Sequence, residues 1–322
     1  MRRTILLALE PGMFSEEQLA QLRAVAPEMR IVVTRDREEI EAILDEIEII
    51  AGWCPRELVL RAPNLRWFQQ WGAGADWLLR YPEAVEREFI LTNASGVHPI
   101  PISEHILAFM LAFARELPRA IRAQEHRQWI PQGQHQGVFE LAGKTMVLIG
   151  VGEIGRRTAW VAAALGMRVL GVRRDPSQSA PGVEAMFGPD RLLELLPQAD
   201  FVVLTVPLTR ETQGMIGERE LRAMKPTAYL INIGRGGTIQ EKALVRALQE
   251  GWIAGAGLDV FETEPLPEDS PLWEMDNVII TSHYAGITPH YHERAWAIFM
   301  DNLRRYRSGD PLRNVVDKRL GY

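Results

Sequence analysis

The run TMVLIGVGEIG, residues 145–155, carries the strongest structural signal in the chain. Mostly apolar, strand-forming residues lead directly into Gly150, Gly152 and Gly155, and a helical pattern follows. In such a turn the first glycine permits a tight bend, the second lets the backbone approach a pyrophosphate, and the third allows close helix–strand packing. The helix N-terminus offers unpaired N–H groups to phosphates. This context favours a dinucleotide-binding turn over an ordinary glycine-rich turn, with Glu153 and Ile154 also beside the cofactor.

Strand-like runs alternate with helical patterns on both sides of this turn, which predicts parallel strands joined by crossover helices. The predicted strands are residues 4–8, 30–34, 48–53, 65–71, 89–93, 145–150, 168–173, 201–207, 228–234, 255–261 and 277–283. Helical stretches are predicted over 15–26, 102–127, 154–165 and 289–307. We therefore expect two α/β domains. Residues 1–99 and 289–322 would form a smaller flavodoxin-like substrate (catalytic) domain, and residues 100–288 a Rossmann-type, doubly wound dinucleotide-binding domain.

Composition restricts the class of protein. The 322 residues are 47% hydrophobic and 24% charged, with a formal net charge of −6, as in a folded globular protein. No window approaches the ~20 continuous apolar residues of a membrane helix, and no basic block suggests a nucleic-acid partner. The single cysteine, Cys54, suits a reducing compartment, so a cytoplasmic location is expected. His283, His290 and His292 lack a metal-ligand spacing, and no metal is expected.

Cofactor choice depends on the residues that follow the second strand of the dinucleotide-binding domain. Arg173 and Arg174 stand where the residue that meets the adenosine ribose is expected. A carboxylate there hydrogen-bonds the ribose of NAD, whereas guanidinium groups bind the 2′-phosphate of NADP. The alternative is a shifted register that places Asp175 at the ribose. We expect NADP(H) to be preferred, with NAD(H) possible.

Further motifs follow the glycine turn in a consistent order: NIGRG at 232–236, GLDVFETEP at 257–265 and TSHYAG at 281–286. Together with GAGAD at 72–76, they make nearly the whole chain resemble the D-isomer-specific 2-hydroxyacid dehydrogenase family. The similarity is greatest to its glyoxylate/hydroxypyruvate reductase-like members. The resemblance implies an NAD(P)-dependent oxidoreductase that reduces a small 2-keto acid, such as glyoxylate, hydroxypyruvate or pyruvate, to the D-2-hydroxy acid.

That reaction needs a proton for the carbonyl oxygen and a group that holds the carboxylate. His283 is suited to act as general acid, and Glu264 would pair with it and favour the imidazolium form. Arg235 would hold the carboxylate and polarise the carbonyl. The resemblance assigns catalysis to these three residues and the nicotinamide carboxamide to Asp259. Each residue alone has a purely structural explanation, whereas the ordered set indicates catalysis. Three more residues are expected beside the cofactor: Pro207, Ile233 and Gly286.

On the substrate side, the resemblance implies that backbone N–H groups of Gly72, Ala73 and Gly74 bind the substrate carboxylate, as an anion-binding nest would. Trp53 and Tyr284 are expected either to wall the substrate pocket or to be rim or core aromatics. Three further residues match family positions: Asn93 and Glu104 as hydrogen-bonding groups near the interdomain linker, and Trp129 in a segment that often reaches a neighbouring subunit. A homodimer is therefore expected.

Two other functions stay open for this sequence. One is an NAD(P)-binding regulatory, corepressor-like module without significant turnover. The other is a dehydrogenase of a different anion, such as phosphite, that uses the same arginine, glutamate and histidine. Measurable turnover distinguishes an enzyme from the first, and a panel of substrates distinguishes the keto acids from the second.

Overall fold

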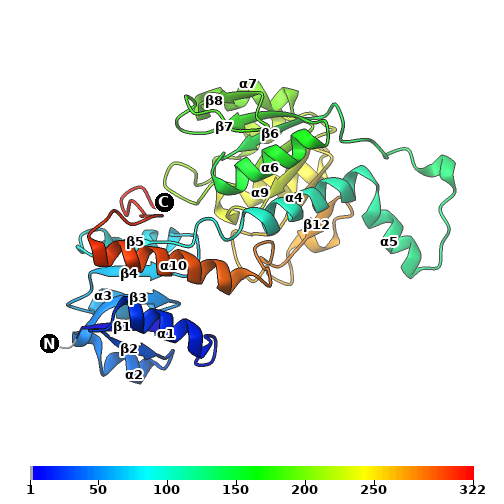
Figure 1. The fold of residues 1–322 in the computed structure, drawn as a ribbon. Coiled ribbons are helices and arrows are strands. Elements are labelled where there is room, and N and C mark those ends of the chain that lie inside the picture. Colours follow the sequence, from blue (N-terminus) through cyan, green and yellow to red (C-terminus); the bar gives the residue numbers. More distant parts are fainter. Residues whose placement is uncertain (1–2) are drawn as a thin grey trace. The chain divides into compact units, whose positions relative to one another are not determined.

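The computed structural model describes residues 3–322, which divide into two α/β units (Figure 1). The first unit comprises the chain up to Val97 together with Pro289–Tyr322, and the second comprises His98–Thr288. The first boundary therefore falls after Val97 rather than after residue 99. Residues 1 and 2, assigned above to the first domain, lie outside the described residues.

A five-stranded parallel sheet forms the centre of the first unit. Its strands are β1 (Thr4–Ala8), β2 (Arg30–Val33), β3 (Ile47–Gly52), β4 (Trp67–Gln70) and β5 (Ile90–Thr92). They pair in the order β2-β1-β3-β4-β5. This is the strand order of flavodoxin-like folds, so the expected fold of the smaller domain is confirmed.

Helices cover both faces of this sheet: α1 (Glu16–Val25), α2 (Arg37–Glu41), α3 (Arg56–Arg61) and α10 (Tyr291–Ser308). Short 3-10 segments are Leu44–Glu46, Asp76–Leu79 and Pro82–Val85. Ser15 caps α1 in a capping box with Gln18, which satisfies backbone donors at the start of the helix. Alternate strand residues enter opposite cores: Ile5 packs with α1 and α10, and Leu6 packs with α2 and α3.

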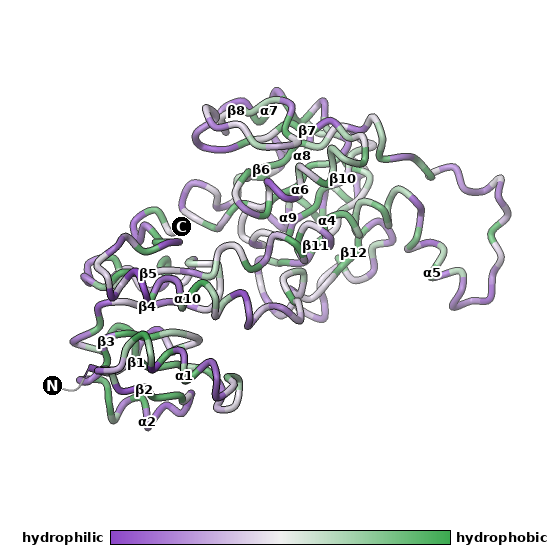
Figure 2. The backbone as a smooth tube through the Cα atoms, in the orientation of Figure 1, coloured by the Kyte–Doolittle hydropathy of each residue, from purple (hydrophilic) through white to green (hydrophobic). Residues whose placement is uncertain are grey.

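A seven-stranded parallel sheet forms the centre of the second unit. Its strands are β6 (Thr145–Ile149), β7 (Arg168–Val172), β8 (Ala185–Phe187), β9 (Phe201–Leu204), β10 (Tyr229–Asn232), β11 (Gly255–Leu258) and β12 (Val278–Ile280). The order is β12-β11-β10-β9-β6-β7-β8, in which the direction of winding reverses between β6 and β9. Figure 2 shows that the central strands carry mostly hydrophobic residues. The expected Rossmann-type sheet is confirmed, and ligands of such sheets lie at the carboxyl ends of the strands.

The helices of the second unit are α4 (Pro99–Ala114), α5 (Leu117–Glu125), α6 (Glu153–Ala164), α7 (Leu192–Leu195), α8 (Glu218–Ala223) and α9 (Glu241–Gln249). Its 3-10 segments are Gln132–Gln134, Pro189–Arg191, Leu196–Gln198, Gly236–Thr238 and Pro271–Glu274. α4 and α6 share a core on one face of the sheet, and α8 and α9 share a core on the other. α5 and the segment after it project from the rest of this unit as an arm (Figure 1).

The prediction of one continuous helix over residues 102–127 is wrong. Glu116 adopts a left-handed conformation with φ of 50°, and α5 begins after it. Pro118 explains the break, because a proline inside a continuous helix lacks the N–H and its ring clashes with the preceding turn. The three-residue strand β8 was missed because it is a short, half-buried edge strand beside β7 alone.

Among residues 3–322, no helix combines the length and the apolar character that a membrane crossing requires.

Candidate active site

The glycine turn after β6 uses its three glycines for different reasons. Gly150 has φ of +98°, in the left-handed region, and a Cβ there would lie 2.8 Å from Val206 Cγ1. A Cβ on Gly155 would clash with the carbonyl oxygen of Gly150. Gly152, the N-cap of α6, would place its Cβ in open space, with no atom within 4 Å. Protein packing therefore requires Gly150 and Gly155, whereas Gly152 leaves room at the helix N-terminus.

That open space fits a pyrophosphate, because the first N–H groups of a helix have no intrahelical partners. Glu153 and Ile154 begin α6, directly beside this space. Thr205, just after β9, donates its hydroxyl to the carbonyl oxygen of Gly150 at 2.5 Å. This hydrogen bond was not predicted from the sequence. The feature that could have indicated it is a hydroxyl residue, Thr205, directly after the neighbouring central strand.

Arg173 and Arg174 follow β7, and the next residue, Asp175, already accepts hydrogen bonds from its own turn. Arg173 follows the strand directly, and its buried Nη1 has no hydrogen-bond partner among residues 3–322. Arg174 is exposed. Asp175 accepts hydrogen bonds from Ser177 Oγ at 2.6 Å and Gln178 Nε2 at 3.2 Å. The bonds from Ser177, above all, hold the pKa of the Asp175 carboxyl below its usual value. Asp175 thus caps its own turn.

Three candidate catalytic residues follow three neighbouring strands of the second unit. Arg235 follows β10, Glu264 follows β11 and His283 follows β12, and these strands are adjacent in the sheet. Parallel strands place their carboxyl ends at the same edge, so the segments that carry these residues begin together.

His283 and Glu264 form a hydrogen-bonded pair. His283 Nδ1 lies 2.7 Å from Glu264 Oε2, and Glu264 Oε1 accepts the Phe261 N–H at 3.0 Å. The His283 side chain is 48% exposed, and its Nε2 has no partner within the described chain. Its backbone is left-handed, with φ of 55°, and its N–H donates to the Asp259 carbonyl at 2.9 Å. The pair therefore fixes the ring and leaves Nε2 accessible for proton transfer.

Asp259 anchors the loop that carries His283. Its carboxylate is 1% exposed and accepts from Thr281 Oγ1 at 2.5 Å, Tyr284 N at 3.1 Å and Ala285 N at 3.0 Å. Since a carboxylate offers about four acceptor positions, one position stays available for a further donor such as a carboxamide.

His105 on α4 supports this loop from a second side. Its Nε2 lies 3.0 Å from Thr281 Oγ1, and its ring meets the Tyr284 ring edge-on with centroids 5.3 Å apart. Burial lowers the pKa of His105 below its usual value, so the ring is neutral at physiological pH. Tyr284 itself is 46% exposed. The sequence analysis did not assign a role to His105, which lies far from Thr281 in the chain.

The Arg235 loop is held by Asn232. The Asn232 side chain accepts from Gly234 N and donates to the Arg235 carbonyl, both at 3.0 Å. A Cβ on Gly236 would overlap the Phe261 backbone, so the loop packs closely against the end of β11. Burial, followed by the charge of Arg235, lowers the pKa of His98 to about 4.

The remaining predicted cofactor residues lie along the same edge of the sheet. Pro207 is exposed after β9, Ile233 is buried directly after β10, and Gly286 ends the TSHYAG segment. A Cβ on Gly286 would approach the His98 ring to 2.8 Å. None of these positions conflicts with cofactor contact.

In the first unit, the Gly72–Gly74 loop follows β4. The N–H groups of Gly72, Ala73 and Gly74 donate to no acceptor among residues 3–322. Trp53 is 43% exposed, and its ring lies 3.0 Å from where a Cβ of Gly72 would be. Asn93, expected as a hydrogen-bonding group near the linker, donates to the Ala73 carbonyl at 2.8 Å. The loop thus presents unpaired amides, as an anion site requires.

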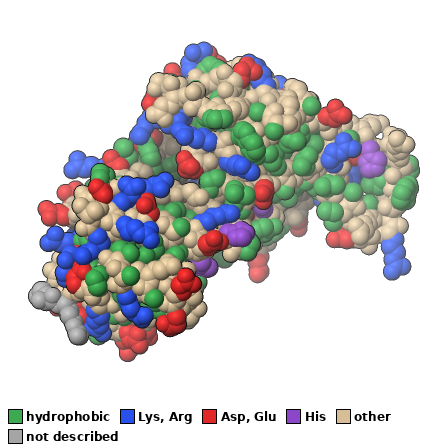
Figure 3. Space-filling view, in the orientation of Figure 1, with side chains coloured by type: hydrophobic (Ala, Val, Ile, Leu, Met, Phe, Trp, Pro, Cys, Tyr) green, Lys and Arg blue, Asp and Glu red, His purple; other side chains and the backbone are tan. Residues whose placement is uncertain are grey.

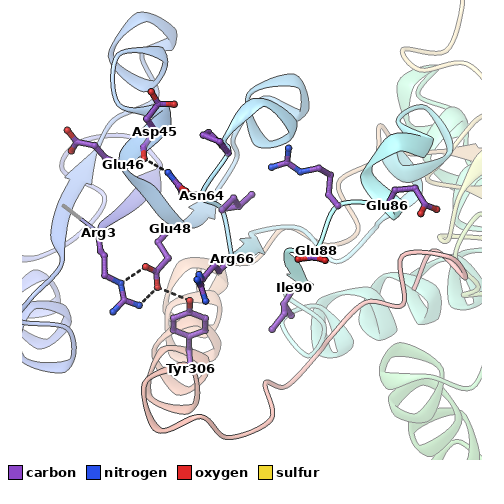
Figure 4. A pocket seen from close by; sticks show the side chains of 13 residues that line it. Arg3, Asp45, Glu46, Glu48, Asn64, Arg66, Glu86, Glu88, Ile90 and Tyr306 are labelled. Carbon is purple, nitrogen blue, oxygen red and sulfur yellow. Dashed lines mark hydrogen bonds and ion pairs between the residues drawn. The ribbon is translucent and has the colours of Figure 1, made fainter. Parts of the chain in front are cut away.

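A hollow of about 1110 Å³ lies at the opposite, amino edge of the same sheet (Figure 4). Burial favours the neutral form of Glu48 there, but its bonds to Arg3 and to Tyr306, the latter at 2.8 Å, outweigh burial and keep the Glu48 pKa below its usual value. No residue predicted for the active site lines this hollow. The ion pair between Arg3 and Glu48 and the hydrogen bond from Tyr306 therefore join the start of β1, β3 and α10 rather than mark the candidate site.

Comparison with known proteins identifies the family of this chain. The model of the NAD binding domain of D-isomer specific 2-hydroxyacid dehydrogenases matches residues 107–285. The glyoxylate reductase of Thermococcus gammatolerans is 37% identical over 313 residues, 95% of this chain and 91% of that protein. The glyoxylate reductase of Korarchaeum cryptofilum is 35% identical over 300 residues, 92% and 88% of the two chains.

Two solved structures are similar over the full length of both chains. One is the NADPH-dependent glyoxylate/hydroxypyruvate reductase of Sinorhizobium meliloti in complex with NADP and sulfate, at 28% identity and a TM-score of 0.84. The other is a D-isomer specific 2-hydroxyacid dehydrogenase of Xanthobacter autotrophicus in complex with NADPH and MES, at 30% identity and a TM-score of 0.83. The chain therefore belongs to the D-isomer specific 2-hydroxyacid dehydrogenase family, as a nicotinamide-dependent oxidoreductase that interconverts 2-keto and 2-hydroxy acids.

Proposed function

We propose that this protein reduces glyoxylate, hydroxypyruvate or a similar small 2-keto acid to the D-2-hydroxy acid, with NADPH as the preferred hydride donor. The pair of His283 and Glu264 is the observation that carries this proposal. It holds one imidazole nitrogen against a carboxylate and leaves the other accessible, as a general acid requires.

The chain's own residues bind, orient and protonate the keto acid. The bound nicotinamide supplies the hydride that reduces the carbonyl carbon. His283 Nε2 donates a proton to the carbonyl oxygen, while Glu264 fixes the ring and provides the counter-charge for the imidazolium. Arg235 holds the substrate and polarises its carbonyl. In the first unit, which we propose as the substrate domain, the amides of Gly72–Gly74 bind the carboxylate.

The cofactor is held by the carboxyl edge of the second unit's sheet, which we propose as the dinucleotide-binding domain. The turn at Gly150–Gly155 holds the pyrophosphate, and Asp259 accepts the carboxamide at its remaining acceptor position. Trp53 in the first unit and Tyr284 in the second, both nearly half exposed, are available for contact with a substrate.

The preference for NADPH rests on Arg173 and Arg174. The buried Nη1 of Arg173 lacks a partner, and Asp175, the only carboxylate close by in sequence, is committed to its own turn. The relatives of Sinorhizobium and Xanthobacter that carry NADP or NADPH support the same choice.

A substrate panel tests the function. Purified protein is mixed with glyoxylate, hydroxypyruvate, pyruvate or phosphite, each with the appropriate reduced or oxidised cofactor, and the nicotinamide absorbance is followed. We expect reduction of at least one small keto acid, faster with NADPH than with NADH. Cofactor binding without turnover on any of these compounds would support a regulatory module instead, and turnover of phosphite alone would support the other anion.

We also propose that the arm of the second unit pairs two copies of the chain. Its exposed apolar side chains include Ile121 at 56% and Trp129 at 89%, and Figure 3 shows hydrophobic side chains along it. A hollow of about 550 Å³ between Ala120 and His135 adds a recess for a partner's side chain. Sedimentation should give a dimer for the wild type and a lower mass for Trp129→Ser. A monomeric wild type would contradict the proposal.

A further inference from the structure

The loop at residues 72–74 is held by its carbonyl groups. Gln70 Nε2 donates to the carbonyl oxygens of Gly72 at 3.1 Å and Gly74 at 2.6 Å. Asn93 Nδ2 holds the Ala73 carbonyl at 2.8 Å. In a trans peptide unit the N–H points opposite to the C=O of the preceding residue. The held carbonyls of Gly72 and Ala73 therefore turn the N–H groups of Ala73 and Gly74 outward.

Gln70 is the residue that spans the loop, since one amide nitrogen bonds the carbonyls on both sides of Ala73. Its side chain is 1% exposed, so no water competes for these bonds. The last residue of β4, it projects from a strand whose position is fixed by pairing with β3 and β5.

Trp77 determines which way the Gln70 amide faces. Its Nε1 donates to Gln70 Oε1 at 2.9 Å. An indole nitrogen is a donor only, so it must meet the oxygen of the amide, and the Gln70 nitrogen is thereby turned toward the loop. Trp77 is 4% exposed, and the Arg56 guanidinium lies over its ring at 4.9 Å. A rigid aromatic side chain thus sets the orientation of the amide.

We infer that Gln70, oriented by Trp77, is a positioning residue for the keto acid: it holds the carbonyls of Gly72 and Gly74 inward, so that the Ala73 N–H, in the same peptide plane as the Gly72 carbonyl, faces the substrate carboxylate. The inference rests on the proposed function, because it concerns the anion that the same loop binds.

Gln69 provides a matched control. It is the preceding residue of the same strand, carries the same side-chain amide and is also 1% exposed. Its side-chain oxygen accepts from Thr92 Oγ1 at 2.8 Å and Asn302 Nδ2 at 3.1 Å, and its nitrogen donates to the Gln70 backbone carbonyl at 3.2 Å. It makes no hydrogen bond to the carbonyls of residues 72–74. Loss of either glutamine removes buried hydrogen bonds, but only loss of Gln70 releases the loop.

The test compares Gln70→Met with Gln69→Met in steady-state kinetics. We expect Gln70→Met to raise the KM for glyoxylate about tenfold or more, with kcat and the KM for NADPH nearly unchanged, because the carboxylate contact is made in both ground and transition states. Gln69→Met should lower the melting temperature and leave the KM for glyoxylate unchanged. Equal KM for glyoxylate in Gln70→Met and the wild type, or equal increases in both variants, would overturn the inference.

Two further measurements keep the test decisive. Trp77→Phe retains the aromatic ring but removes the N–H, and it should raise the KM for glyoxylate in the same direction by a smaller factor. Oxalate, an anion that is not reduced, is titrated calorimetrically into each protein with NADP⁺ present. If the wild type reduces no keto acid, the proposed function fails, and the oxalate titration is then the test of the inference about Gln70. Weaker binding to Gln70→Met than to Gln69→Met supports the inference, and equal binding overturns it.

Discussion

Two glycine loops in this chain present backbone amides in different ways. The turn at Gly150–Gly155 belongs to the second unit and leads into α6, a helix of twelve residues whose N-terminus supplies the unpaired N–H groups. The loop at Gly72–Gly74 belongs to the first unit and leads only into the short 3-10 segment Asp76–Leu79. Its amides are unpaired because side chains hold the neighbouring carbonyls. The first arrangement is encoded within a few residues, whereas the second needs partners elsewhere in the fold.

The glycines differ accordingly. Gly150 and Gly155 are required by contacts inside the protein, whereas a Cβ on Gly152 would meet no protein atom and would enter the space proposed for the pyrophosphate. Around the other loop, support comes from Gln70 on β4, Asn93 after β5 and the Tyr291 hydroxyl of α10, which bonds the Trp71 carbonyl at 2.7 Å. A helix start therefore needs little support, while a loop without a helix is organised by side-chain hydrogen bonds.

The largest expected effect is on kcat and comes from a substitution at His283, outside both glycine loops. His283→Ala removes the proposed general acid, and we expect kcat to fall by about 10²–10⁴. Binding of NADPH, measured by its fluorescence, should stay within about twofold of the wild type, because neither glycine loop loses a contact. An unchanged kcat would show that another group supplies the proton.

Variants of Gly155 and Gly152 distinguish a role in packing from a role in ligand contact. Gly155→Ala brings a Cβ against the Gly150 carbonyl oxygen and should destabilise the fold by about 2–4 kcal/mol in chemical denaturation. Gly152→Ala meets no atom, so its stability should change by less than about 1 kcal/mol, while the KM for NADPH rises about tenfold or more. Equal stability losses in the two variants would contradict the distinct roles given to these glycines.

A variant of Arg173 tests whether this residue determines the preference for NADPH over NADH. Arg173→Asp replaces the proposed phosphate-binding guanidinium by a carboxylate, and the ratio of kcat/KM for NADPH over NADH should fall about 10- to 100-fold. Arg168→Asp, at the exposed start of the same strand, is the charge-matched control and should leave the ratio unchanged. The same ratio in wild type and Arg173→Asp would mean that the ribose lies elsewhere.

The smallest expected effect is on the pH dependence of stability. Backbone amides do not titrate, so anion binding by the two loops themselves should not depend on pH. His98 does titrate, and its pKa of about 4 in the folded chain lies below its ordinary 6.5. The folded state then binds fewer protons than the unfolded state between these values, so stability is lost as the pH falls from 6.5 toward 4. His98→Gln should remove about 1–3 kcal/mol of this acid destabilisation in denaturant titrations. An identical pH dependence in the variant would exclude His98 as a cause.

The same contrast explains what the sequence could predict. The Gly150 turn and the positions of every strand except β8 were predictable because hydrophobic runs and glycine spacing are local features. The candidate catalytic residues were assigned through their motifs, and the strands that they follow are neighbours in the sheet. Gln70, Asn232 and His105 escaped because a buried amide or imidazole has no sequence pattern, and its partner is known only once distant strands are paired. The break at Glu116 was missed because apolar periodicity continues across it.

The most direct test of the account is transfer of a labelled hydride. Protein is incubated with hydroxypyruvate and NADPH that carries deuterium at both positions of nicotinamide C4, and the product is analysed by mass spectrometry and chiral chromatography. The account predicts D-glycerate with one deuterium on C2, formed more than a hundred times faster by the wild type than by His283→Ala. Absence of the label from C2, or the L-isomer as product, would contradict it.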